Sequence, residues 1–216
     1  HELRTPITIV SSKLEGLLKH PNNTINDEVE SIAEAMNETR RLKKMINDLL
    51  TLTKEDYVDV IQKEEVDLEA LVKDLCDDFF DIAMIQNKTL KVSSNLKHKN
   101  ILSDKNKLRQ LFIIFIDNAF KYTEEDDYIK ISLSEKDEKI YIKIEDNGLG
   151  IKKEELPHLF DRFFRSENVR NKDIDGSGIG LSIAKVICDS LKYKLEVDSE
   201  YGKWTEFKIS IPIDVD

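Results

Sequence analysis

Residues 175–183 read DGSGIGLSI, in which three glycines at alternate positions lead directly into the apolar residues of a helix. Residues 145–151, EDNGLGI, hold two more, so five of the seven glycines lie in two short boxes. Glycine permits backbone conformations that expose N–H groups, and the N-terminus of a helix favours negative charge. The two boxes therefore predict a phosphate-binding site, and a nucleotide is the natural ligand.

Two commoner phosphate motifs are excluded by spacing. No GK[ST] ending follows the glycines, as a P-loop requires, and Gly176, Gly178 and Gly180 are spaced G-x-G-x-G, unlike the dinucleotide fingerprint. Tight turns flanking a helix remain the structural alternative for either box alone. Asp146 in the first box favours a nucleotide, because its carboxylate can accept a hydrogen bond from an exocyclic amine such as that of adenine.

A third motif, DNAFKYT at residues 117–123, ends a strongly apolar helix. Asn118, Lys121 and Tyr122 would emerge on neighbouring faces within one turn. They offer an amide oxygen for Mg²⁺, a cation for phosphate and an aromatic face for a base. Each also has a structural alternative, respectively as a helix-end cap, a solvated charge and a core ring.

The fourth motif is LFDRFFR at residues 159–165. Its phenylalanines, Phe160, Phe163 and Phe164, are suited to docking, while Arg162 and Arg165 supply positive charge. The polar stretch that follows, SENVRNKDID at residues 166–175, is typical of a mobile lid.

The N-terminal segment opens with HELRTPIT and has the periodicity of helices in a bundle. Alternating steps of three and four predict one packed stripe over residues 3–18, formed by Leu3, Ile7, Val10, Leu14 and Leu17. After the break HPNNTIND, Asp27 and Glu30 predict a capping box that opens a second helix, which runs to about Thr53. A helical hairpin has too little core to be stable alone, so we expect a homodimer that forms a four-helix bundle.

The same register places His1, Glu2 and Thr5 on the solvent side of the bundle. An exposed imidazole beside a carboxylate is suited to nucleophilic attack, because the carboxylate can orient one ring nitrogen while the other attacks. An inert surface histidine is the alternative, and the nucleotide motifs further along the chain favour a functional one.

From residue 61 onward helices and strands are mixed. The alternating runs YIKISLSE and KIYIKIED form a predicted hairpin, and shorter runs occur at 89–94, 99–103, 192–199 and 204–212. Helices are expected over 68–82, 106–122 and 180–191. The predicted fold class is α+β, with a helical hairpin domain at 1–60 and, at 61–216, an α/β layer sandwich whose helices cover one face of a largely antiparallel sheet.

The composition of the chain excludes some classes of binding partner. The formal net charge of −10 disfavours nucleic acid and anionic lipid as general partners. Cys76 and Cys188 lie in apolar helical patterns and are expected to be reduced core residues. No run approaches the 18 apolar residues of a membrane span, so any membrane attachment would come through upstream segments absent from this sequence.

Taken in order, these motifs resemble the catalytic core of a sensor histidine kinase of the two-component type. HELRTPIT is similar to the phosphoacceptor box, DNAFKYT to the N box, EDNGLGI and GSGIGLSI to the two glycine boxes and LFDRFFR to the F box. The resemblance implies a dimerisation and phosphotransfer hairpin followed by an ATP-binding domain of the kind found in gyrase, MutL and heat-shock chaperone ATPases. It also implies the cytoplasmic portion of a plasma-membrane sensor.

The resemblance implies roles for individual residues. His1 would accept the γ-phosphoryl group of ATP with Glu2 as proton acceptor, and Thr5 would position a water for dephosphorylation of the response regulator. Asn118 would hold Mg²⁺, and Asp146 would read the adenine amine. The other ATP-binding positions would be Lys121, Tyr122, Gly148, Gly150, Arg165, Gly176, Gly178, Gly180 and Leu181.

The sequence departs from the family pattern at two places in the second domain. Ile114 occupies a position that is often a second asparagine, and Trp204 replaces a glycine ahead of Thr205. Two alternatives therefore stay open: an ATP-binding module that does not phosphorylate itself, and a degenerate kinase that serves as a dimeric scaffold.

Overall fold

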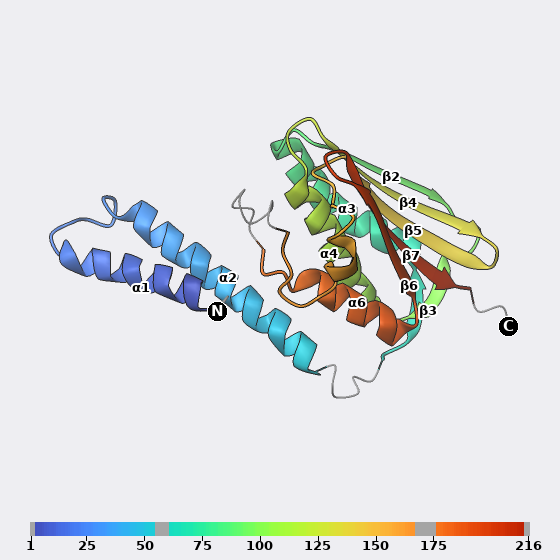
Figure 1. The fold of residues 1–216 in the computed structure, drawn as a ribbon, viewed down its shortest axis with the longest axis horizontal. Coiled ribbons are helices and arrows are strands. Elements are labelled where there is room, and N and C mark those ends of the chain that lie inside the picture. Colours follow the sequence, from blue (N-terminus) through green and yellow to red (C-terminus); the bar gives the residue numbers. More distant parts are fainter. Residues whose placement is uncertain (1–2, 55–60, 167–175, 214–216) are drawn as a thin grey trace. The chain divides into compact units, whose positions relative to one another are not determined.

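The computed structural model describes residues 3–54, 61–166 and 176–213. The chain divides into two compact units, His1–Val58 and Asp59–Asp216. Each unit has its own secondary structure and core (Figure 1).

The first unit is a helical hairpin of α1 (Arg4–Lys19) and α2 (Val29–Lys54). Its two helices pack through buried Pro6 on α1 and buried Ala35 and Met45 on α2. Ile7 and Leu14 of the predicted stripe are half exposed in the single hairpin, so their packing within a bundle stays a prediction. Pro6 and the stem of Lys13, whose ammonium pairs with Glu34 of α2, lie at the hairpin interface in their place.

The capping box occurs three residues before its predicted position. The side chain of Asp27 accepts hydrogen bonds from the backbone N and the Oγ1 of Thr24, both at 2.8 Å. Thr24 Oγ1 in turn accepts a hydrogen bond from the backbone N of Asp27 at 3.4 Å. These bonds lower the pKa of Asp27 and fix the turn that leads into α2.

A second apolar strip remains uncovered on the hairpin. Its members are each about half exposed and recur at helical spacing: Ile7, Leu14, Val29, Met36, Ile46 and Leu50. A strip of this size on so small a unit is the surface that a partner helix pair would bury.

The second unit is built from eleven elements in the described residues. They are β1 (Glu64–Asp67), α3 (Leu68–Ile85), β2 (Thr89–Asn95), β3 (Asn100–Ser103), α4 (Lys105–Tyr122), β4 (Tyr128–Lys136), β5 (Lys139–Asp146), the short 3₁₀ helix η1 (Leu156–His158), α6 (Gly180–Leu191), β6 (Lys194–Glu200) and β7 (Trp204–Pro212).

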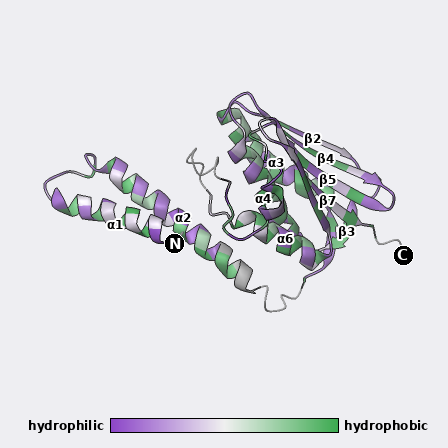
Figure 2. Ribbon diagram, viewed as in Figure 1, coloured by the Kyte–Doolittle hydropathy of each residue, from purple (hydrophilic) through white to green (hydrophobic). Residues whose placement is uncertain are grey.

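The main sheet has the strand order β2-β4-β5-β7-β6, with β2 parallel to β4 and the other pairs antiparallel. Helices α3, α4 and α6 cover one face (Figure 1). Hydrophobic and hydrophilic residues alternate along the strands (Figure 2), so that Ile140, Ile142 and Ile144 of β5 are buried beneath the helices. The predicted α+β layer sandwich is confirmed.

Two details of strand pairing differ from the sequence-based expectation. The strand predicted near residues 99–103 is β3, which lies outside the main sheet and pairs with β1. The four residues of β1, EEVD, contain one apolar side chain and were not predicted as a strand.

In the described parts of the chain, no helix is long and apolar enough to cross a membrane.

Candidate functional site

The C-terminal turn of α4 carries Asn118, Lys121 and Tyr122. The ammonium of Lys88 donates hydrogen bonds to the carbonyl oxygens of Phe120 at 2.7 Å and Thr123 at 2.9 Å. The Phe120 ring stacks on Phe79 of α3, with centroids 5.3 Å apart. These contacts satisfy carbonyls that a helix end would otherwise leave unpaired, and they fix the turn on which the candidate residues lie.

The first glycine box packs directly on this helix end. The backbone N of Leu149 donates a hydrogen bond to the carbonyl oxygen of Tyr122 at 3.0 Å. A Cβ added at Gly148 would lie 2.1 Å from the same oxygen, closer than any side chain allows. Glycine at 148 is therefore required for the contact between the two motifs.

The other side of this box is held by the turn between β6 and β7. The N–H of Gly202 donates to the carbonyl oxygen of Leu149 at 2.7 Å. Gly150 has a φ of +61°, and a Cβ there would meet the carbonyl oxygen of Glu200 at 2.1 Å. The loop thus adopts one conformation between two fixed backbone segments, and only glycine fits at either contact.

Asp146 ends β5 beside this loop and is 4% exposed. Its Oδ1 accepts a hydrogen bond from the N–H of Gly148 at 3.0 Å. The pKa of Asp146 is raised to about 7, chiefly by burial. The Gly148 hydrogen bond opposes the shift, and the nearby carboxylates of Asp127 and Glu145 contribute to it. A carboxylate buried at this depth is costly unless a ligand hydrogen-bonds to it.

The F box and the second glycine box are also joined through the backbone. The N–H of Phe163 donates to the carbonyl oxygen of Gly178 at 3.0 Å, and Gly178 has a φ of +69°. Arg165 lies near enough to Tyr122 to lower the pKa of the phenol, although burial has the larger effect and raises it. The F box therefore contacts the second glycine box, and the charge of Arg165 acts on Tyr122 at the end of α4.

The second glycine box opens α6. A Cβ at Gly180 would lie 3.6 Å from the Cγ2 of Ile114, so that Ile114 of α4 packs where the two helices meet. Among the described residues no side chain caps the N-terminus of α6, and its first turn has no acidic residue. Leu181, in that turn, is half-buried. The uncapped N–H groups leave donors for an anion.

Asn118 has an unsatisfied amide. Its Nδ2 is buried and has no hydrogen-bond partner in the described structure. The nitrogen and oxygen of an amide exchange places by a flip of the side chain, so either atom can occupy this position. Lys121, by contrast, pairs with Asp117 one turn earlier at 2.7 Å.

The structure describes only some of the remaining predicted site residues. Thr5 is exposed in the first turn of α1, whereas His1 and Glu2 lie outside the described residues. The same holds for residues 167–175, which make up nearly all of the predicted lid. Gly176 is described, and no atom of the described residues lies within 4 Å of the position its Cβ would take.

One residue at this end of the sheet was left out of the predicted site because Trp204 departs from the family pattern just before it. Thr205 is directly opposite Asp146 in the β5–β7 register, so that both side chains point to the same buried face. Ser199 contacts the Thr205 hydroxyl at 3.1 Å and accepts a hydrogen bond from the N–H of Ile151 at 2.8 Å. The substitution at Trp204 does not displace Thr205, and only the strand register reveals its place.

Comparison with known proteins identifies both units. Residues 103–215 match the family described as histidine kinase-, DNA gyrase B- and HSP90-like ATPases. Residues 1–57 match the His kinase A phosphoacceptor domain.

The chain is also similar to individual sensor proteins and histidine kinases. The sensor protein CiaH of Streptococcus pneumoniae serotype 4 is 36% identical over 213 residues, which cover 99% of this chain and 48% of that protein. The chain thus spans about half the length of this curated relative. The histidine kinase AdeS of Acinetobacter baumannii has a TM-score of 0.80 at 25% identity, over 100% of this chain and 98% of that one.

A solved complex has the same fold. Histidine kinase ThkA, in a structure with the response regulator protein TrrA, has a TM-score of 0.80 at 24% identity. The match covers 98% of this chain and 59% of that one.

The buried carboxyl of Asp146 predicts a pH dependence of stability. Its folded pKa of about 7 lies above the unfolded value of about 3.9, so the folded state binds the proton more tightly. The contribution of this group to the free energy of unfolding is therefore fully present below about pH 4 and is lost as the pH rises through about 7. Each unit of difference between the folded and unfolded pKa corresponds to about 1.4 kcal/mol. Asp146→Asn should remove this loss, so that its stability gain over wild type, from urea unfolding, is larger at pH 8 than at pH 5. Asp137→Asn, in the exposed hairpin turn, is the control, and an equal gain for Asp146→Asn at both pH values would contradict the prediction.

The close approach of Gly148 predicts an unequal response of two glycines. Gly148→Ala must separate the first glycine box from α4, which should cost about 2–4 kcal/mol of unfolding free energy. Gly176→Ala adds the same methyl group in open space and should change that free energy by less than about 0.5 kcal/mol. Urea unfolding measures both, and equal losses would show that the contact at Tyr122 does not constrain residue 148.

Proposed function

The chain belongs to the sensor histidine kinases of two-component systems, and from that premise we propose that it is an ATP-dependent histidine autokinase. The γ-phosphoryl group of ATP would pass to His1 and then to an aspartate of a response regulator. The observation that carries the proposal is a set of contacts between the motifs. Backbone hydrogen bonds join the first glycine box to the end of α4 and the F box to the second glycine box, and Gly180 packs beside Ile114 of α4. Residues 1–57 match a phosphoacceptor domain. An ATP-binding module that does not phosphorylate itself would not require such a domain.

The nucleotide is proposed to bind with its base near Asp146. The carboxylate accepts a hydrogen bond from the adenine amine, and the half-buried ring of Tyr122 packs nearby. The phosphates meet the uncapped N–H groups of α6, from Gly180 and Leu181 onward, together with the cations Lys121 and Arg165. Gly148, Gly150, Gly176 and Gly178 shape the backbone around the ligand.

Asn118 is the proposed protein ligand of Mg²⁺. Its buried amide has a terminal atom without a partner, as an unfilled ligand position requires. The described residues contain no cluster of three His, Cys, Asp or Glu side chains, which agrees with a cation held mainly by phosphate oxygens and water. When bound, Mg²⁺ neutralises charge on the phosphates.

The chemistry at His1 is a phosphoryl transfer. One imidazole nitrogen attacks the γ-phosphorus, the bond to the β–γ bridging oxygen breaks, and ADP leaves with that electron pair. The Glu2 carboxylate takes the ring proton, so that a neutral phosphohistidine remains in place of a cationic one. The response regulator then receives the phosphoryl group on a carboxylate oxygen as the N–P bond breaks. The ring nitrogen keeps that electron pair, and the proton held by Glu2 returns to the ring, which restores the neutral imidazole.

Two further activities complete the proposal. Thr5, exposed one turn after His1, would orient a water for hydrolysis of the phosphorylated regulator. Because the chain spans about half of its curated relative, we propose that it is the cytoplasmic catalytic portion of a longer sensor at the plasma membrane.

Autokinase activity is tested with γ-labelled ATP and Mg²⁺. The expected product is an acid-labile, alkali-stable protein label, which His1→Gln abolishes while nucleotide binding remains. Asn118→Ala should reduce the labelling rate at least tenfold, whereas Asn106→Ala, an exposed position on the same helix, should leave it within twofold. Nucleotide binding without any label on the wild-type chain, extended upstream of His1, would reduce the proposal to an ATP-binding module, and absence of nucleotide binding would leave a scaffold.

Homodimerisation is proposed to bury the uncovered apolar strip of the hairpin. Ile7→Glu places a charge in that strip and should shift the monomer–dimer equilibrium at least tenfold toward monomer, as measured by analytical ultracentrifugation. Ser12→Glu adds the same side chain to another face of α1 and should leave the equilibrium unchanged. An equal effect of the two substitutions would exclude this strip as the interface.

A further inference from the structure

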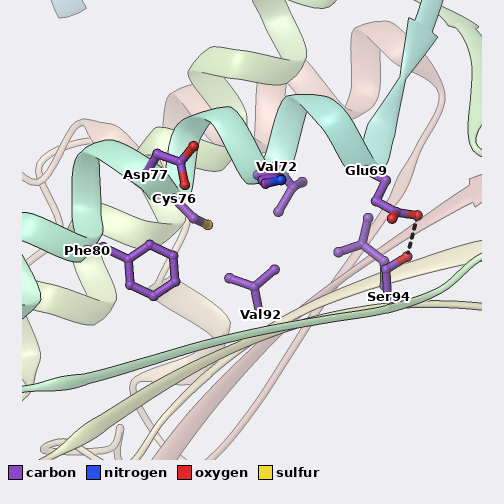
Figure 3. A pocket seen from close by; sticks show the side chains of 9 residues that line it. Glu69, Val72, Cys76, Asp77, Phe80, Val92 and Ser94 are labelled. Atoms are coloured by element: carbon purple, nitrogen blue, oxygen red, sulfur yellow. Dashed lines mark hydrogen bonds between the residues drawn. The ribbon is translucent and has the colours of Figure 1, made fainter.

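A cavity lies between α3 and the edge of the main sheet, with a volume of about 300 Å³. Figure 3 shows the side chains that line it, with Cys76 and Phe80 of α3 facing Val92 of β2. Its floor is apolar and buried, formed by Val72, Cys76 and Leu133. This volume is more than enough for one medium-sized apolar side chain of a partner, and the proposed kinase reaction does not use it.

The groove is closed at one end and open at the other. The hydroxyl of Ser94 donates to Glu69 at 3.1 Å, and Lys99 pairs with the same carboxylate at 3.0 Å. At the opposite end Phe80 is 39% exposed, and Met84, one turn further on the same helix face, is 77% exposed. An apolar surface therefore continues out of the cavity along α3.

Strand β2 forms one wall and is an edge of the sheet. Among the described residues it pairs with β4 alone, over all seven of its positions. The backbone groups on its outer side are free to pair with an added strand. An extended segment can thus bind by backbone hydrogen bonds while one of its side chains fills the groove.

The helix that forms the other wall has a strongly acidic margin. Asp74, Asp77 and Asp81 recur at three- and four-residue spacing, are exposed, and have no ion-pair partner among the described residues. Lys73, which also lines the groove, is the only basic residue of α3, which has five acidic ones, so the helix as a whole is strongly acidic. The charge along the groove selects a cationic segment.

We propose that this groove binds an extended, cationic segment of a partner protein, which adds a strand to β2 and places an apolar side chain over Cys76. The flanking Lys or Arg side chains of that segment face the carboxylates of α3. The interaction lies outside the proposed nucleotide site and does not require nucleotide.

The test uses the whole chain without ATP, so that a failure of the autokinase proposal leaves its outcome unaffected. The probe is the peptide Lys-Ser-Lys-Leu-Lys-Ser-Lys. One control replaces its Leu with Ser, and a second replaces every Lys with Glu. Fluorescence anisotropy measures affinity, and amide hydrogen exchange maps the bound strand.

The Leu peptide should bind at least tenfold more tightly than either control and should slow exchange at amides of residues 89–95. Asp77→Lys and Val92→Lys should each weaken it at least tenfold. Glu154→Lys makes the same charge change at an exposed site elsewhere and should have less than a twofold effect. Circular dichroism confirms that each variant is folded.

Three outcomes would overturn the proposal. Equal weakening by Asp77→Lys and Glu154→Lys would show general attraction to an acidic chain. Binding without protection of β2 would exclude strand addition. Protection of β2 that appears without peptide and is lost on dilution would show that a second copy of the chain covers this edge.

Discussion

The hydrogen bond from the N–H of Leu149 to the carbonyl of Tyr122 is the contact on which the arrangement of the site depends. It joins the end of α4 to the loop after β5, and therefore brings the Asn118 amide and the Asp146 carboxylate to one end of the sheet. The bond is possible only because residue 148 has no side chain. A single absent Cβ thus decides whether two motifs 26 residues apart in sequence, counted from 122 to 148, can act on one ligand.

The same region is built at the expense of stability. A carboxyl with 4% exposure is easier to bury as the neutral acid, and an unpaired amide atom on α4 loses its hydrogen bonds to water. The hydrogen bond from the Gly148 N–H offsets part of the first cost, and no described residue offsets the second. Both are offset when a ligand offers a donor to the carboxylate and a partner to the amide, so that binding energy compensates for strain already present in the free domain.

Much of this could be predicted from local sequence because local sequence determines it. Helix α4, the β4–β5 hairpin and the positive φ values at Gly150 and Gly178 follow from periodicity and residue type. Tertiary features were less accessible. The strand β1 has one apolar residue and exists only because β3 pairs with it, and Thr205 is recognised as a neighbour of Asp146 only through the register of β7. On α1, periodicity marked the apolar positions, but it could not show that Ile7 and Leu14 stay half exposed within one hairpin.

The two faces of α3 extend this reasoning beyond the site. Its inner face is fixed by the stacking of Phe79 on Phe120, in the same turn of α4 that carries Lys121 and Tyr122. Its outer face, one residue away at Phe80, borders the unfilled groove. Because neighbouring residues on a helix project about 100° apart, the same turn of α3 packs on α4 through Phe79 and borders the groove through Phe80. A segment bound in the groove would therefore lie against the same helix that packs on the end of α4.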